Sequence, residues 1–92
     1  MEPGERRRIE RLYQRVVATR TNCRFEDLER LLVACGFERR APGSGSSHVT
    51  FRRPAKGNRP AQRIPIPKHR PVKTYYVNDV LAMLGDRPWE GD

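Results

Sequence analysis

His48 opens the alternating run HVTFRR, directly after the glycine- and serine-rich segment GSGSS. Imidazole has an ordinary pKa of about 6.5, so near neutral pH it can both accept and donate a proton. Arg52 has the same parity in the run, and a guanidinium matches the geometry of phosphate oxygens. These residue types could perform acid–base chemistry at a phosphate, and the adjoining glycines would let a phosphate approach closely. An exposed histidine on a strand is more often not catalytic, so the residues alone leave both interpretations open.

Positive charge is concentrated in one segment of the chain. The 92 residues include 19 Lys and Arg and 11 Asp and Glu, a net charge of +8. The segment from Arg39 to Lys73 holds ten of the basic residues and no acidic one, so it carries +10 and the remainder carries −2. Such a segment attracts polyanions, of which nucleic acid is the most common. The alternative is an ordinary solvated surface.

Three helices are expected to position these residues, over 3–19, 25–35 and 74–84, because apolar residues recur there with a helical period. Gly36 and Gly85 are expected to end the second and third helices. Beyond them, residues 86–92 are expected to form a flexible tail. Trp89 in this tail is expected either to pack back on the domain or to anchor a partner.

Three strands are expected over 37–40, 48–53 and 62–67, the last at a sheet edge because it contains prolines. The predicted fold class is α+β, with an antiparallel sheet that is covered by helices on one face and open to water on the other. Alternation assigns these residues to the open face: Glu38, Arg40, His48, Thr50, Arg52 and Arg63.

The segments FEDLERLLVACGFERR, GSSHVTF and IPIPKHRPVKTYYVNDVLAMLG, in this order and spacing, resemble the HicA family, the toxins of HicA–HicB toxin–antitoxin pairs. The resemblance covers Phe25 to Gly85 and implies a fold like that of double-stranded-RNA-binding domains, α-β-β-β-α. It implies a domain over 23–85, with residues 1–22 as an additional N-terminal helical extension. The stretch GSGSSH is longer than the tightest form of the family motif.

The resemblance also implies an endoribonuclease that cuts messenger RNA and is neutralised by a cognate HicB-like antitoxin. The family's functional histidine corresponds to His48, which would act as general acid and base. The Ile-Pro-x-His element corresponds to Ile66, Pro67 and His69. For the N-terminal helix we consider extra packing, a contact to the antitoxin or a dimer surface.

We expect RNA to contact a set of basic and hydroxyl side chains around this histidine: Arg40, Ser47, Arg52, Arg53, Lys56, Arg63, Lys68, His69, Arg70 and Lys73. Arg52 is the first choice for stabilising the charge on phosphorus. Glu38 would either orient the imidazole or neutralise an arginine, with the second favoured. His69 would contact phosphate, cap the loop before the last helix or have no role, and Tyr75 is a candidate for stacking on a base.

No metal or cofactor motif is recognisable, and RNA supplies its own nucleophile in the 2′-hydroxyl, so we expect no cofactor. Cys23 and Cys35 lack metal-ligand spacing and are expected to be reduced thiols of a cytoplasmic protein. No apolar run is long enough for a transmembrane span. The competing hypotheses are a non-catalytic RNA-binding module that uses the same basic face and a degenerate toxin that only binds its antitoxin.

Overall fold

The computed structural model describes residues 2–40 and 48–90. Its helices are α1 (Pro3–Ala18), α2 (Phe25–Ala34) and α3 (Thr74–Leu84), its strands are β1 (Glu38–Arg40), β2 (His48–Arg53) and β3 (Gln62–Pro67), and a short 3₁₀ helix η1 (Pro88–Glu90) follows α3. Each predicted helix and strand is present, with bounds within one residue of the prediction. None of these helices is long and apolar enough to cross a membrane.

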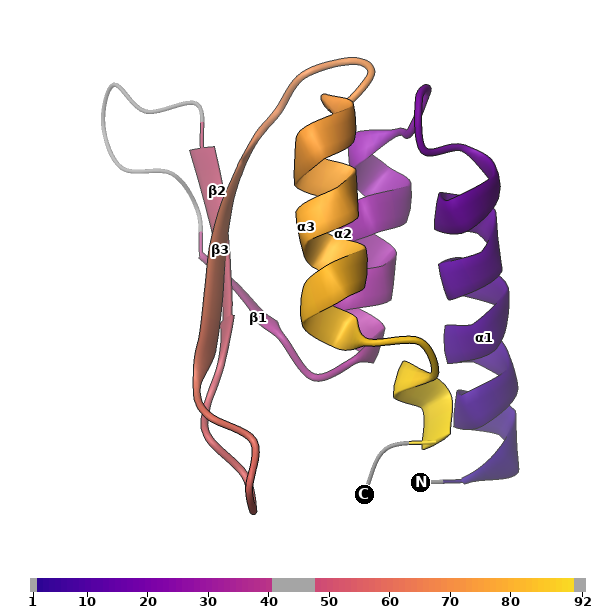
Figure 1. Ribbon diagram of the computed structural model, residues 1–92, viewed down its shortest axis with the longest axis vertical. Coiled ribbons are helices and arrows are strands. Elements are labelled where there is room, and N and C mark those ends of the chain that lie inside the picture. Colours follow the sequence, from indigo (N-terminus) through magenta and orange to yellow (C-terminus); the bar gives the residue numbers. More distant parts are fainter. Residues whose placement is uncertain (1, 41–47, 91–92) are drawn as a thin grey trace.

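The molecule is arranged in layers. The strands form one antiparallel sheet in the order β1-β2-β3. Helices α2 and α3 cover one face of this sheet, and α1 packs on the side of α2 that is turned away from it (Figure 1). The predicted α+β class, the α-β-β-β-α order of α2 to α3 and the additional N-terminal helix are confirmed. Proline-containing β3 lies at a sheet edge, also as predicted.

The covered face of the sheet forms one side of the hydrophobic core. Val49 and Phe51 of β2 and Ile66 of β3 are fully buried, because alternate side chains of a strand point to the same face. The apolar stripes of the helices complete the core from the other side: Ile9, Tyr13, Val16, Leu28, Leu31, Leu32, Val77, Val80, Leu81 and Leu84. The residues between them on β2 are therefore directed away from the helices.

Helix α2 ends at a glycine in the left-handed region. Gly36 has a φ of 97°, a conformation that costs glycine little because it has no Cβ. The N–H of Gly36 donates to the carbonyl of Val33 and the N–H of Phe37 donates to the carbonyl of Leu32, both at 3.0 Å. This is the paired hydrogen-bond pattern of a Schellman motif, and it turns the chain from α2 directly into β1.

Helices α2 and α3 begin next to each other. Cys23 and Val72 form an antiparallel bridge in which the N–H of Val72 donates to the carbonyl of Cys23 at 2.9 Å. Each helix starts two residues after its bridge residue, so the N-terminal ends of α2 and α3 lie side by side (Figure 1). The chain reaches Val72 shortly after β3 ends at Pro67, and Pro67 is the cross-strand partner of His48, the first residue of β2. The starts of α2 and α3 therefore lie at the same end of the molecule as His48.

The C-terminal segment packs against α1 through Trp89. The indole ring meets the ring of Tyr13 edge to face, with centroids 5.4 Å apart. The hydroxyl of Tyr13 donates to the carbonyl of Gly85 at 3.0 Å. Two roles were considered for Trp89, and the structure shows the first: its side chain packs back on the domain. The added helix and the end of the chain thus stabilise each other.

Candidate nucleic-acid interface

The open face of the sheet carries three cross-strand rows of side chains. On β2, His48 and Arg52 are exposed while Val49 and Phe51 are buried. The strand register gives the rows: Glu38, Arg52 and Arg63 in the first, Arg40, Thr50 and Pro65 in the second, and His48 with the buried Pro67 in the third. His48 therefore lies at one end of the open face, where β2 begins, and its side chain is exposed as predicted.

Arg40 is the arginine of the open face that the register brings nearest to His48. Arg40 pairs with Thr50, and His48 precedes Thr50 by two residues on the same strand and face. Such diagonal neighbours are about 7–8 Å apart, within reach of two long side chains. A phosphate held by the Arg40 guanidinium can therefore lie next to the imidazole of His48.

Arg52 lies in a different part of the same face. It follows His48 by four residues on β2, a separation of about 13 Å along an extended strand. Arg52 and Arg63 are instead direct cross-strand partners beside a hollow of about 480 Å³ at the other end of the sheet. The predicted arginines thus form two groups, and Arg52 lies too far along the strand from His48 for both to contact the same phosphate.

Glu38 is engaged with an arginine and not with the histidine. Its carboxylate lies 3.1 Å from the Nε of Arg40, and both side chains are about half exposed. Glu38 is in the first row and His48 in the third, so the two are separated by about the same distance as Arg52 and His48. Of the two roles considered for Glu38, the geometry favours neutralisation of an arginine.

Arg53 belongs to the covered side of the sheet. Its guanidinium lies over the ring of Phe37, 4.5 Å from the centroid. It donates one hydrogen bond to the carbonyl of Cys35 at 2.8 Å and another to the side-chain oxygen of Gln62. Gln62 in turn donates to the carbonyl of Met83 at 3.2 Å. Arg53 therefore connects β2 to the ends of α2 and α3. Its guanidinium makes contacts within the molecule and is not directed toward the open face.

The segment after β3 carries basic side chains from the His48 end of the sheet toward the helix starts. The Nζ of Lys68 lies 5.8 Å from the ring centroid of Phe25. His69 is exposed, and its backbone N–H donates to the carbonyl of Pro67 at 2.9 Å. Lys73 is exposed directly before α3. These residues join His48 at one end of the molecule because Pro67 is the cross-strand partner of His48.

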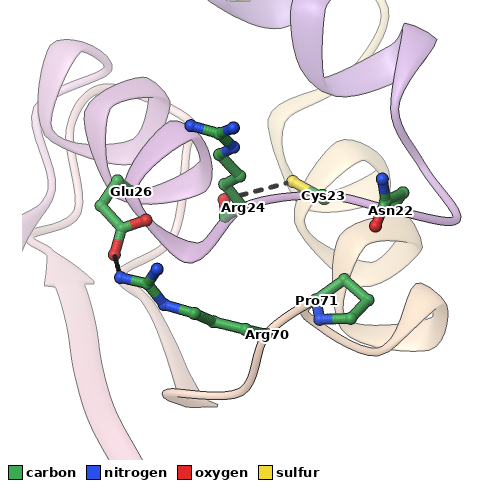
Figure 2. Close-up of a pocket in the computed structure, with 6 residues that line it drawn as sticks. All are labelled: Asn22, Cys23, Arg24, Glu26, Arg70 and Pro71. Atoms are coloured by element: carbon green, nitrogen blue, oxygen red, sulfur yellow. Dashed lines mark hydrogen bonds and ion pairs between the residues drawn. The ribbon is translucent and has the colours of Figure 1, made fainter.

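Arg70 lines a pocket at the start of α2, of about 450 Å³. In Figure 2 its guanidinium reaches across to Glu26, and an Nη atom lies 3.3 Å from the carboxylate. Arg24 lines the same pocket, with its side chain extending away from Arg70. Arg24 lies outside the segment between Arg39 and Lys73 and is not among the residues that the sequence singled out.

The remaining predicted residues are dispersed. Lys56 is exposed in the turn between β2 and β3, far from His48 at the opposite end of the hairpin. Tyr75 is 54% exposed at the start of α3 and lies against Tyr76, with ring centroids 4.3 Å apart. Tyr75 therefore remains a candidate for stacking on a base. Ser47 and the rest of the segment GSGSS lie outside the described residues.

The cysteines are free thiols, Cys23 buried and Cys35 partly buried. Burial raises the pKa of the Cys35 thiol to about 11, against a smaller opposing effect of the Arg53 charge. Burial also raises the pKa of Cys23. Both thiols are therefore protonated at neutral pH and poor nucleophiles. Within residues 2–40 and 48–90, no group of three or more His, Cys, Asp or Glu side chains could hold a metal ion.

Comparison with known protein families identifies the central part of the chain. Residues 25–85 match a family model described as the HicA toxin of bacterial toxin–antitoxin. The matched region runs from the first residue of α2 to the glycine that follows α3, so it contains the whole sheet and excludes α1 and η1. No curated protein and no solved structure matches the chain.

Proposed function

The chain belongs to the HicA family, the toxins of bacterial toxin–antitoxin pairs, and on that premise we propose that it is an endoribonuclease that cleaves messenger RNA with His48 as general acid and base. Family membership implies a cognate antitoxin as partner. The observation that carries the proposal is the exposed position of His48 on the open face, one diagonal step from Arg40.

The reaction that suits these side chains uses a nucleophile within the RNA. The imidazole of His48 removes the proton of a 2′-hydroxyl, and the 2′-oxygen forms a bond to the adjacent phosphorus. The bond from phosphorus to the 5′-oxygen breaks, and that oxygen takes a proton from the imidazolium. The products are a 2′,3′-cyclic phosphate and a free 5′-hydroxyl, with atoms and protons balanced. No metal is needed to generate the nucleophile.

Negative charge grows on the phosphoryl oxygens as the 2′-oxygen attacks. A guanidinium that is already in place stabilises this charge more than it stabilises the starting phosphodiester. Arg40 is the arginine whose position suits this role. Arg52 and Arg63 would hold the neighbouring part of the strand, and Lys68, His69, Arg70 and Lys73 would bind phosphates beyond His48. Cleavage of messenger RNA would take place in the cytoplasm.

The two histidines of the chain provide a matched test. Wild type, His48→Ala and His69→Ala would be incubated with an RNA oligonucleotide in EDTA. We expect cleavage by wild type and His69→Ala and no cleavage by His48→Ala. All three should bind RNA, with His69→Ala binding somewhat more weakly because it loses a phosphate contact. The product ends should be a 2′,3′-cyclic phosphate and a 5′-hydroxyl, and a 2′-deoxy substitution at the cleaved position should abolish the reaction.

Cleavage by His48→Ala at the wild-type rate would show that the site assignment is wrong. RNA binding without cleavage by wild type and both variants would favour a non-catalytic RNA-binding module. Co-expression with the gene of the antitoxin should restore growth in cells that express the wild-type chain, whereas cells that express His48→Ala should grow without it.

A further inference from the structure

A polar groove lies between the end of α1 and the start of α2. Its volume is about 310 Å³, and it is lined by Arg15, Thr19, Asn22, Arg24, Asp27 and Arg30. Three arginines and one aspartate give it a formal charge of +2. In the linear sequence these residues belong to the part whose charges sum to −2, so the positive surface arises only when the chain folds.

Asp27 forms ion pairs with two of these arginines. Its carboxylate lies 3.9 Å from the Nε of Arg15 and 3.6 Å from an Nη of Arg30. The side chain of Asp27 is 12% exposed, whereas those of Arg15 and Arg30 are 65% and 59% exposed. A guanidinium has five N–H donors, so each arginine keeps donors for a further anion while the buried carboxylate holds its position. Cations held in this way suit a phosphate group.

The groove continues to the proposed RNA site. Asn22 and Arg24 line both this groove and the pocket of Figure 2, in which Arg70 lies. Arg70 follows Pro67 by three residues, and Pro67 is the cross-strand partner of His48. Arg24 has no ion-pair partner within the part of the chain that the structure describes. A surface of net positive charge thus runs from the His48 end of the sheet, past the start of α2, to α1, with Glu26 as an acidic residue along it that pairs with Arg70.

We propose that this groove binds the phosphate backbone of RNA that extends beyond the site at His48. The proposal rests on the proposed function and deepens it, because it assigns the added helix α1 to the RNA-binding surface. RNA is favoured over an acidic protein segment because every side chain that lines the groove is polar or charged, whereas protein interfaces are built around an apolar centre. All three cations are arginines, the residue best matched to phosphate.

The test measures binding of two RNAs in a His48→Ala background, one just long enough to be cleaved and one with long single-stranded flanks. Arg24→Gln should weaken binding of the long RNA about ten-fold at low salt and lower the slope of log affinity against log salt by about 1. Arg15→Gln and Arg30→Gln would be combined with Asp27→Asn, so that no buried carboxylate is left unpaired, and should have a larger effect. The short RNA should lose much less affinity.

The matched control is Arg6→Gln. Arg6 is exposed on α1 and precedes Arg15 by nine residues, which is two and a half helical turns and therefore the opposite side of the helix. The Arg6→Gln substitution removes one positive charge outside the groove, so its effect on RNA binding measures the contribution of net charge alone. Thermal unfolding of each variant checks that the fold is kept.

The proposal is wrong if the groove variants bind the long RNA as tightly as the Arg6→Gln control does. It is also wrong if they lose affinity for the antitoxin while RNA binding is unchanged, since the groove would then bind protein. Failure of the proposed function has a different signature. In that case the wild-type chain would cleave neither RNA, while the length-dependent loss of binding in the groove variants would still be observed.

Discussion

Glu38 and Arg40 stand two residues apart on the same face of β1, and the carboxylate of Glu38 lies 3.1 Å from the guanidinium of Arg40. Arg40 is also the arginine that the strand register brings nearest to His48. Glu38 therefore forms an ion pair with the arginine that a phosphate at His48 would contact. Although the guanidinium keeps further N–H donors, the carboxylate would compete with a phosphate for Arg40 and offset part of its charge in the proposed reaction.

Glu38→Gln should strengthen RNA binding several-fold. The substitution removes the competing anion, and because both side chains are about half exposed, we expect the free energy of unfolding to change by less than about 1 kcal/mol. Fluorescence anisotropy at several salt concentrations measures the affinity. Glu10→Gln, an exposed carboxylate on α1, is the matched control for net charge. An equal gain in both variants would mean that Glu38 acts only through net charge and does not compete with RNA for Arg40.

Arg40→Gln should slow cleavage more than Arg52→Gln. The geometry predicts a loss in kcat of about ten- to a hundred-fold for Arg40→Gln, because the lost cation lies beside the reacting phosphate. Arg52→Gln should mainly raise KM, since Arg52 is placed about 13 Å along the strand from His48. Single-turnover rates and KM for both variants provide the comparison. If kcat falls mainly in Arg52→Gln, Arg52 is the arginine of the reaction.

Arg53→Ala should destabilise the fold. Its guanidinium packs over Phe37 and donates to the carbonyl of Cys35 and to Gln62, so its loss leaves these acceptors unpaired. We expect a cost of about 1–3 kcal/mol in the free energy of unfolding. The exposed neighbour Arg52 is the matched control, since Arg52→Ala should weaken RNA binding with little effect on stability. Urea unfolding and RNA binding would be measured for both variants. Unchanged stability with weakened RNA binding in Arg53→Ala would mean that Arg53 acts mainly on RNA.

The raised pKa of Cys35 predicts slow alkylation and a fall in stability at high pH. Since the folded pKa is about 11 and the ordinary value is 9.0, the folded state holds the proton more tightly. The stability from this group is present below pH 9 and is lost as the pH rises toward 11. At pH 8 a difference of two units leaves roughly a hundred-fold less thiolate than in an unfolded chain. Iodoacetamide labelling with and without denaturant, with Cys23→Ala to isolate Cys35, checks this. Equal rates would contradict the burial of the thiol.

The elements of this fold are predictable from the sequence because each one has a simple period. Apolar residues at helical spacing define α1, α2 and α3, and the alternation around Val49 and Phe51 defines β2. The same alternation correctly placed His48 and Arg52 on the exposed side of β2, because parity depends only on the strand itself.

Which residues of the open face are neighbours is not predictable in the same way. Strand register depends on the pairing between strands and on the connections that join them, and a shift of two residues would keep every side chain on its face. For this reason the sequence favours Arg52, which shares a strand and a face with His48, although the register brings Arg40 nearer to His48. The arginine groove was missed for a similar reason, since Arg15, Arg24 and Arg30 come together only when α1 packs on α2.

Trp89→Ala should weaken the attachment of α1 to the rest of the molecule. The indole ring meets Tyr13 edge to face at 5.4 Å, and the Tyr13 hydroxyl donates to the carbonyl of Gly85. Because Trp89 is partly buried, we expect a loss of about 1–3 kcal/mol in the free energy of unfolding. Tyr13→Phe, which removes only the hydrogen bond, should cost about 1 kcal/mol.

A double-mutant cycle separates the ring contact from the other effects of these substitutions. Urea unfolding of Tyr13→Ala, Trp89→Ala and the double variant should give a coupling energy of about 0.5–1.5 kcal/mol, the usual value for an aromatic pair. Arg87→Ala, a neighbouring exposed residue paired with Glu90, is the control and should change stability little. Additive losses in the two aromatic variants would mean that Trp89 does not hold α1, and the helix would then owe its position to Ile9 and Val16 against α2.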